Sequence, residues 1–325
     1  MLMPSEETCR IVAKGRLLAI GDIHGNEAGF RELLRMAGLI NTTGDWVGGN
    51  AILVLTGDII GRGGSPRRIY GLIRRLSRQA RQAKGRVEML LGNHEGLSMH
   101  DIHNYTTLQE YQDFAPRTAW SFDKMLREAY HDLPLPSATE NPLDLGQLQA
   151  EPLGWIELRR AMAPTGMVGR WLTRRNSVIK VGQILFVHGG LHPRWAPIPL
   201  EDLNRNIRVE LSRHGTYFNL DPKHPALAED GPHWYRVGLR RSEDALRQEL
   251  DEVFALQRSV RMVVGHTPTY LHNPQRTGRI VSKCEGRLLC IDTGIGQAYG
   301  ARLGGIEIFP DGNVRAFYPD GEELF

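Results

Sequence analysis

Short apolar runs of strand length recur along this chain, and each leads directly into a cluster of polar residues. Residues 16–20 (Arg-Leu-Leu-Ala-Ile) lead into residues 21–26 (Gly-Asp-Ile-His-Gly-Asn), and residues 51–55 (Ala-Ile-Leu-Val-Leu) lead into residues 56–58 (Thr-Gly-Asp). Continuous apolar runs of this length, bounded by glycine, are typical of buried strands. Since ligands of open α/β sheets bind outside the carboxyl ends of the strands, the pattern predicts a site at these ends.

An amphipathic helix is predicted after each of these two units. Residues 27–37 carry apolar side chains at helical spacing and end at Gly38, a common residue at helix C-termini. Residues 66–83 form the second predicted helix, and Pro66 suits its first position. This helix is rich in arginine. We interpret its charges as a solvated face, because no aromatic residues interleave with them as platforms for nucleic-acid bases.

The third unit, residues 86–91, ends at Gly92 and is followed at once by Asn93, His94 and Glu95. After it the alternation of strand and helix breaks, and residues 97–175 show several short helical patterns. The aromatic residues of this stretch are expected to be exposed: Tyr105, Tyr111, Trp120, Trp155 and Trp171. We predict one domain over residues 1–325 with an inserted helical lid over residues 97–175 that selects the substrate.

Strands resume in the second half of the chain. Residues 184–187 end at His188, and residues 261–264 lead into Gly265 and His266. The C-terminal part contains further short apolar runs joined by glycine and proline turns, at residues 279–281, 288–291, 303–309 and 313–317. These runs predict an antiparallel second sheet.

Composition narrows the class of protein. The chain has 325 residues, of which 41% are hydrophobic and 24% charged, as in ordinary globular proteins. Its net charge of +3 gives no strong field for nucleic acid or membranes, and its three cysteines are too few and scattered for a disulfide framework or a thiolate zinc site. Because no apolar run reaches the length of a signal or membrane segment, we expect a cytoplasmic protein without nucleic-acid or membrane partners.

The predicted strand ends bring together carboxylate, imidazole and amide side chains. They are Asp22, His24, Asp58, Asn93, His94, His188 and His266. Such oxygen and nitrogen donors suit Mn, Fe, Zn or Mg. Two cations about 3.5–4 Å apart can clamp a phosphoryl group and generate hydroxide at neutral pH when one carboxylate bridges them. A lone histidine is more often a structural residue, but a donor at each of five strand ends favours a metal site.

The motifs at residues 21–25, 57–63, 92–95, 188–191 and 265–266 resemble those of the calcineurin-like metallophosphoesterase superfamily. Within it they are most similar to the phosphoprotein phosphatase branch, especially its bacterial Shewanella-like members. The resemblance runs from about Leu17 to the C-terminus and covers the insert only loosely. It implies an α/β fold in which a two-sheet mixed β-sandwich is flanked by helices in four layers (αββα), with a helical insertion.

The resemblance also implies two divalent metal ions per chain, with Mn expected first and Fe, Zn or Mg as alternatives. One metal would be held by Asp22, His24 and the bridging Asp58. The other would be held by Asp58, Asn93, His188 and His266. A metal-bridging hydroxide would be the nucleophile.

Three further residues receive catalytic roles from the resemblance. His94 would protonate the leaving group as the general acid, and Arg62 and Arg236 would grip the phosphate. The family motif Gly-Asp-x-x-Asp-Arg-Gly departs here at Gly61, which replaces the acid that normally orients the catalytic histidine. The sequence does not identify the group that takes its place.

The expected function is hydrolysis of phosphomonoesters, with a phosphorylated protein or a small phosphoester as substrate. Pro268 stands where nuclease and phosphodiesterase branches usually carry a second imidazole. We therefore expect a protein phosphatase for phospho-Ser/Thr or phospho-Tyr. One alternative is a nucleotide or dinucleoside polyphosphate hydrolase, and a less favoured one is a catalytically weak, metal-bound scaffold.

Overall fold

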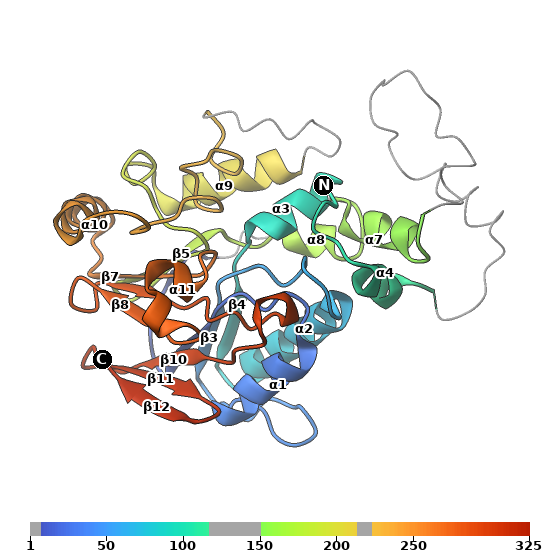
Figure 1. The fold of residues 1–325 in the computed structure, drawn as a ribbon, viewed down its shortest axis with the longest axis horizontal. Coiled ribbons are helices and arrows are strands. Elements are labelled where there is room, and N and C mark those ends of the chain that lie inside the picture. The colour runs from blue at the N-terminus through green and yellow to red at the C-terminus, as the bar shows by residue number, and fades with distance from the viewer. Residues whose placement is uncertain (1–7, 117–150, 213–222) are drawn as a thin grey trace.

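The computed structural model describes residues 8–116, 151–212 and 223–325, and its architecture is two stacked β-sheets with helices on their outer faces (Figure 1). Each sheet has six strands and mixes parallel with antiparallel pairs. The α/β fold that was predicted, a mixed two-sheet sandwich flanked by helices, is confirmed.

The first sheet has the strand order β12-β11-β10-β2-β3-β4. Its parallel half comprises β2 (Leu17–Ile20), β3 (Ile52–Leu55) and β4 (Arg86–Met89). Its antiparallel half comprises β10 (Gly305–Ile308), β11 (Val314–Tyr318) and β12 (Gly321–Leu324). Helices α1 (Glu27–Met36) and α2 (Pro66–Gln82) connect the parallel strands and cover this sheet (Figure 1).

The second sheet has the strand order β1-β5-β6-β7-β9-β8. Its strands are β1 (Arg10–Ile11), β5 (Val178–Val181), β6 (Ile184–Val187), β7 (Arg261–Val264), β9 (Leu288–Cys290) and β8 (Val281–Lys283). Strands β6, β7 and β9 run parallel to one another. Helices α9 (Leu200–Leu211), α10 (Glu243–Gln257) and α11 (Thr269–His272) lie on this side of the molecule (Figure 1).

The prediction of a separate antiparallel sheet built from the C-terminal strands is wrong. Strands β8 and β9 extend the second sheet, whereas β10, β11 and β12 extend the first. The physical reason is that β10 pairs along the free edge of β2, with Ile306 opposite Ala19. An apolar run shows that a segment is a strand, but the edge it completes depends on which strands are still unpaired in the folded chain.

Buried apolar side chains hold the first sheet and helix α1 together. Strands β2 and β3 are buried along their whole length, as expected for parallel strands covered on both faces. Phe30, Leu33 and Leu34 form the buried stripe of α1, and each contributes about 1.5–3 kcal/mol by leaving water. At its start, the Asn26 side chain accepts the backbone N–H of Gly29 at 3.0 Å. The sandwich therefore holds the loops at the strand ends in place.

In the described parts of residues 97–175 and directly before them lie the short helices α3 (Asn93–Met99), α4 (Leu108–Phe114), α7 (Trp155–Met162) and α8 (Gly169–Leu172). Tyr105 is exposed, as predicted, whereas Trp155 and Trp171 pack half-buried against the core. The expectation of exposure is wrong for Tyr111, which is buried because α4 packs against α7. Trp120 lies outside the described residues.

Two 3₁₀ turns, at Pro274–Arg276 and Gln297–Tyr299, complete the regular segments of residues 8–116, 151–212 and 223–325. Among the helices described above, none is both long enough and apolar enough to cross a membrane.

Candidate metal centre

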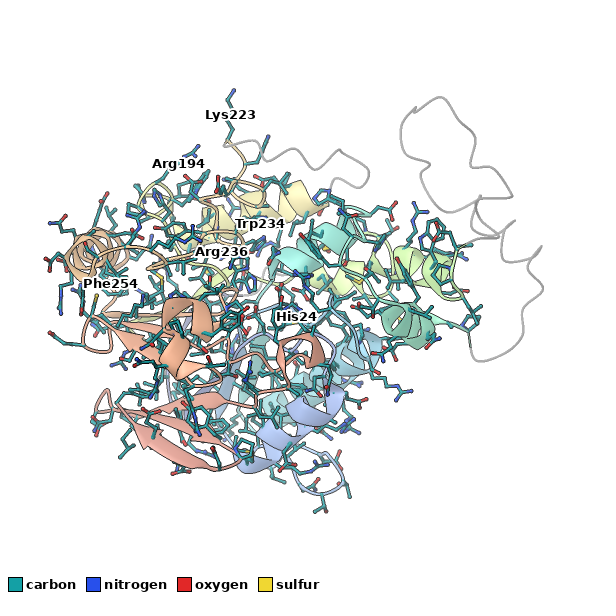
Figure 2. All side chains as sticks on the ribbon, viewed as in Figure 1. His24, Arg194, Lys223, Trp234, Arg236 and Phe254 are labelled. Atoms are coloured by element: carbon teal, nitrogen blue, oxygen red, sulfur yellow. The ribbon has the colours of Figure 1, made fainter. Side chains whose placement is uncertain are left out.

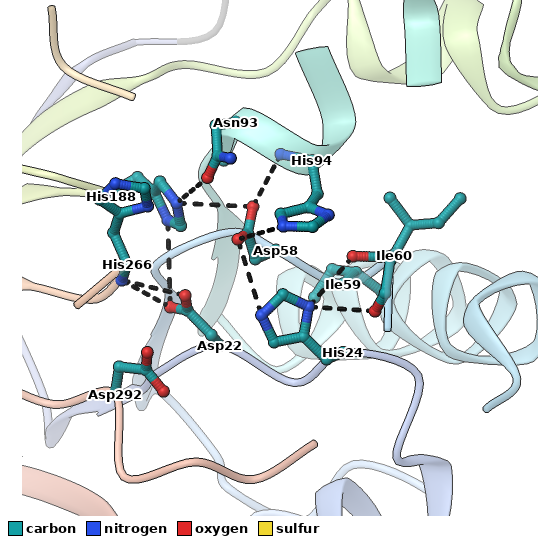
Figure 3. A network of polar contacts seen from close by, with 12 residues as sticks. Asp22, His24, Asp58, Ile59, Ile60, Asn93, His94, His188, His266 and Asp292 are labelled. Carbon is teal, nitrogen blue, oxygen red and sulfur yellow. Dashed lines mark hydrogen bonds and ion pairs between the residues drawn. The ribbon is translucent and has the colours of Figure 1, made fainter. Parts of the chain in front are cut away.

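The predicted ligands meet where the parallel strands of both sheets end (Figure 3). Strands β2, β3 and β4 lead into Asp22 with His24, Asp58, and Asn93 with His94, while β6 and β7 lead into His188 and His266. All of these side chains are buried. The structure thus brings together every residue that was predicted to bind metal, although the segments are far apart in the sequence.

Asp58 lies at the centre of the cluster and belongs to two sets of potential ligands. The ligand atoms of His24, Asp58 and His94 lie within 4.8 Å of one another, and so do those of Asp58, His188 and His266. One carboxylate shared by two adjacent sets is the arrangement that a bridging ligand of two cations requires. His94 belongs to one set by geometry, so its position permits metal ligation as well as proton transfer.

Asp22 and Asn93 complete the cluster through contacts with the histidines. Asp22 accepts the backbone N–H of His266 at 2.9 Å, which ties the end of β2 to the end of β7 across the two sheets. The side-chain oxygen of Asn93 lies 3.0 Å from Nε2 of His188. Both oxygens therefore point into the space that the imidazoles surround (Figure 3).

Backbone carbonyl groups orient two of the imidazoles. Nδ1 of His24 donates to the carbonyl of Gly61 at 3.1 Å, and Nδ1 of His188 donates to that of Thr56 at 2.9 Å. Nε2 of each ring faces Asp58, at 3.7 Å and 3.4 Å, and in the neutral ring with its proton on Nδ1 this nitrogen offers a lone pair. This is the usual way in which proteins prepare a histidine for a metal.

His266 provides a direct test of whether the site fits a metal. Its Nε2 is buried and has no hydrogen-bond partner among the described residues, although burial of an unpaired polar atom is costly. A metal ion would satisfy this nitrogen together with His188 and Asp58. The donor set of carboxylate, imidazole and amide suits Mn, Fe, Zn or Mg.

The electrostatics of the cluster also favour a cation. Burial favours the neutral form of His188, yet the carboxylates of Asp58 and Asp22 outweigh it and raise its pKa to about 10. Burial and the neighbouring carboxylate of Asp292 hold the pKa of Asp22 well above its usual range. These carboxylates repel one another at close range, and divalent cations would relieve that repulsion.

Strained backbone marks the same residues. His24, Asp58, Arg62 and His266 all have φ in the left-handed region, at 43°, 51°, 74° and 63°. Such conformations cost non-glycine residues about 1–3 kcal/mol each and persist only where the surroundings hold them. Four such residues in the loops at the strand ends indicate that the surrounding structure holds these loops in a conformation that the site requires.

Glu95 supplies much of that support from beneath the cluster. Its carboxylate accepts the backbone N–H groups of Asp58 at 2.9 Å, Ile59 at 2.8 Å and Gly92 at 2.9 Å. It also accepts the hydroxyl of Tyr70 at 2.9 Å. The loops after β3 and β4 are therefore bound to one buried anion.

The two predicted phosphate-gripping arginines lie at the edge of the cluster. The guanidinium of Arg62 stacks over the ring of Tyr105 at 4.2 Å, and its buried Nε has no hydrogen-bond partner among the described residues. Arg236 belongs to the segment between α9 and α10, next to Trp234 (Figure 2). It donates to the carbonyl of His266 at 3.3 Å and to the hydroxyl of Thr267 at 3.2 Å.

His94 lies in the first turn of α3, and its backbone N–H donates to Asp58 at 3.0 Å. Its Nε2 lies 3.9 Å from the other oxygen of Asp58. Burial lowers the pKa of His94 to about 4; Asp58 opposes the shift, while His24 and Arg62 add to it. The imidazole is therefore neutral at pH 7 until an anion approaches it.

The structure explains why glycine occupies position 61. Gly61 has a φ of 84°, and a Cβ built on it would overlap Nδ1 of His94. The imidazole of His94 thus occupies the space that a side chain at position 61 would need. An acid could not stand at this position without displacing His94.

Glu110 is a site residue that the sequence analysis missed. Its buried carboxylate accepts the N–H groups of Gly61 at 2.6 Å, Gly63 at 3.1 Å and Thr107 at 2.8 Å. It therefore fixes the loop that carries Arg62. No sequence signal marked it, because Glu110 lies 49 residues beyond Gly61 in a stretch interpreted as a lid.

Asp292 is a second site residue that the sequence analysis missed, although the sequence contains a signal for it. It follows the buried strand β9 just as the other acids follow theirs, and β9 runs parallel to β7. Asp292 lies beside Asp22 (Figure 3) and accepts the N–H of Gly294 at 3.1 Å. Burial raises its pKa to about 7.

The two-sheet sandwich thus carries, at the carboxyl ends of its strands, a cluster of side chains that could hold metal ions. Residues 15–275 match the family model of the calcineurin-like phosphoesterases. The chain therefore belongs to the calcineurin-like phosphoesterase family and is a metallophosphatase.

Among similar proteins, Shewanella-like protein phosphatase 2 of Arabidopsis thaliana is 29% identical over 315 residues, which are 92% of this chain and 76% of that protein. Shewanella-like protein phosphatase 1 of Plasmodium berghei is 26% identical over 86% of this chain and 67% of that protein. The similarity thus extends beyond the bacterial members of the Shewanella-like group.

Among solved structures, the cold-active protein-tyrosine phosphatase of a Shewanella species has a TM-score of 0.74 at 22% identity and covers 98% of this chain and 82% of its own. A protein serine/threonine phosphatase from Saccharomyces cerevisiae has a TM-score of 0.54 at 13% identity and covers 98% of this chain and 84% of its own. Both structural similarities support the two-sheet α/β fold.

Proposed function

We propose that this protein is a protein phosphatase that hydrolyses phosphomonoesters with two divalent cations. The observation that carries the proposal is the pair of ligand sets that share Asp58 at the strand ends. The names of the Shewanella-like relatives support a phosphorylated protein as the substrate. Pro268, in the place of a second imidazole, supports a monoester.

The proposed ligand sets are those that the family resemblance implies, and the closeness of His24 to Asp58, and of His188 and His266 to Asp58, supports them. Asp22, His24 and Asp58 hold one cation, and Mn is the first candidate for it. The other is held by Asp58, Asn93, His188 and His266. When bound, the cations supply an activated water and neutralise charge on the phosphoryl group.

The proposed substrate contacts lie at the rim. Arg62 donates from its unpaired Nε to a phosphate oxygen, and the face of Tyr105 keeps its guanidinium in place. Arg236 is held by the loop of His266 and offers its remaining N–H groups from the opposite side. Together they orient the phosphate towards the metal-binding residues.

His94 is the proposed general acid. A bound phosphate dianion favours the charged imidazolium and so raises the pKa of His94 towards neutrality. The ring then carries a proton on Nε2, which it gives to the leaving oxygen of the substrate. Its backbone N–H bond to Asp58 keeps the ring beside the cluster during this step.

A comparison of three substrates in the presence of Mn tests the proposal: a phosphotyrosine peptide, a phosphoserine peptide and a dinucleoside tetraphosphate. We expect at least one peptide to have a kcat/KM at least about tenfold higher than the tetraphosphate, a difference of 1.4 kcal/mol in transition-state binding. Asp58→Asn is the inactive control. A preference for the tetraphosphate would contradict the proposal and indicate a nucleotide hydrolase.

A further inference from the structure

A basic groove is lined by residues of α2, of the edge strand β4 and of the segment at the end of α8. Its volume is about 960 Å³, near the upper end of the range for ligand pockets. Five exposed cations line it: Arg74, Arg78, Arg81, Lys84 and Arg174. The single acid among its described lining residues, Glu88, is paired with Arg86 at 2.7 Å.

The arginines of α2 divide into two groups. Outside the groove, Arg68 pairs with Asp113 at 3.3 Å and Arg75 with Asp45 at 4.0 Å. The guanidinium of Arg67 donates to the backbone carbonyl groups of Asp113 and Phe114. In contrast, the five cations of the groove form no ion pair within the part of the chain that the structure describes. Like charges three and four residues apart destabilise a helix. An unpaired stripe on one face of α2 is therefore not explained by the stability of the helix.

We propose that the basic groove binds an acidic segment of a polypeptide and, taking the proposed function as given, that this segment belongs to the phosphoprotein substrate. Arg74, Arg78 and Arg81 follow one another along α2 with rises of about 6 Å and 4.5 Å. In an extended chain, side chains on the same face are about 6.6 Å apart. Carboxylates at alternate positions can thus reach successive guanidinium groups, which bind them in a bidentate manner.

The aromatic lining of the groove argues against single-stranded nucleic acid as the occupant. Such ligands need free aromatic faces on which bases stack. Trp171 is the one aromatic residue among the described lining, and the guanidinium of Arg175 lies over its ring at 4.8 Å. Tyr70 packs against the same indole, with a centroid distance of 6.0 Å. Charge rather than stacking therefore determines what the groove can hold.

A binding measurement tests the groove without relying on catalysis. The probes are two fluorescein-labelled peptides of equal length, one alternating Gly and Glu and the other alternating Gly and Gln. At low ionic strength the full-length protein should bind the Glu peptide at least tenfold more tightly, and R74Q/R78Q/R81Q should abolish the difference. The control variant R35Q/R205Q/R247Q loses the same number of charges, from α1, α9 and α10. It should keep the preference for the Glu peptide.

Three outcomes would overturn the proposal: equal binding of the two peptides, equal loss in the control variant, or tighter binding of a single-stranded DNA oligonucleotide through the same arginines. Thermal melts confirm that the variants are folded. If the triple variant melts early, R78Q alone should lose part of the preference, and an unchanged preference would count against the groove.

A kinetic measurement then tests the link to the substrate. A phosphopeptide with the Glu tail should have a KM at least fivefold lower than the same peptide with the Gln tail, at unchanged kcat, and the triple variant should lose this advantage. If the Glu tail binds but leaves KM unchanged, the segment does not belong to the substrate. If phosphopeptides are not hydrolysed while Glu-peptide binding persists, the proposed function fails and the groove stands.

Discussion

At the scale of single residues, Gly61 combines a left-handed backbone with close contact to His94. Gly61→Ala should cost about 1–2 kcal/mol for the backbone alone, and more because its Cβ would overlap Nδ1 of His94. Gly49→Ala is the matched control, since Gly49 has a φ of 56° with no atom near its Cβ position. Urea unfolding should show the larger loss for Gly61→Ala, and equal losses would contradict the steric argument.

The same contact predicts a catalytic effect. Displacing His94 should slow the turnover of alkyl phosphates, which need a general acid, more than that of nitrophenyl phosphate. Gly61→Asp meets the same overlap, so it should displace the imidazole rather than provide the partner that relatives have. If Gly61→Ala slows the turnover of both substrates equally, the result would contradict the role of His94 as the general acid.

Glu110 predicts a pH dependence of stability. Burial raises its pKa from 4.5 to about 7, so between these values the folded protein binds more protons than the unfolded chain. The stability that Glu110 contributes is therefore full below about pH 4.5 and is lost as the pH rises through about 7. In metal-free protein, the difference in unfolding free energy between wild type and Glu110→Gln should be larger at pH 5 than at pH 8. A constant difference would contradict this pKa.

At the scale of elements, the segment that leads into α4 holds the loop after β3. Glu110 binds the backbone on both sides of Arg62, the carbonyl of Tyr105 accepts the N–H of Arg62 at 2.9 Å, and the ring of Tyr105 covers its guanidinium. The sequence pattern predicts that this stretch is part of a lid that selects the substrate. Its first part also positions a proposed phosphate-binding residue.

Tyr105→Ala tests this role of the segment. Loss of a cation–π contact of about 1 kcal/mol should weaken inhibition by inorganic phosphate roughly fivefold, while Tyr105→Phe should keep wild-type affinity because its ring remains. Tyr270→Ala, at another half-exposed tyrosine, is the control. Unchanged phosphate inhibition in Tyr105→Ala would show that Arg62 does not depend on this ring.

At the scale of the whole molecule, the cluster joins the two sheets through buried acids and histidines. Cations that bind only the folded chain should stabilise it by about 2.7 kcal/mol at a hundred times their Kd. Mn should therefore raise the Tm of the EDTA-treated protein. Asp58→Asn, which weakens both proposed sites, should lose most of this increase, whereas the exposed Asp45→Asn should keep it. Equal increases in both variants would contradict a shared site at Asp58.

The sequence by itself determined the first two helices, the donor residues and most of the strands, but not the short edge strands β1 and β12. Apolar runs that end in Gly-Asp, Asn-His or Gly-His are local patterns, and parallel strands bring their carboxyl ends to one edge whatever the loops between them. Asp292 follows the same rule after β9 and could have been included. The roles of Arg62, His94 and Arg236 stay predictions, as do the lid and the single-domain organisation.

Only the tertiary structure decided which edge each C-terminal strand completes, that Tyr111 is buried, and that Glu110 holds the loop of Arg62. These features depend on contacts between segments distant in the chain, which no local periodicity encodes. The basic groove has the same origin. The arginines of α2 look like an ordinary solvated face in the sequence, and only the packing of α2 beside β4 and α8 gathers them, with Lys84 and Arg174, into one concave surface.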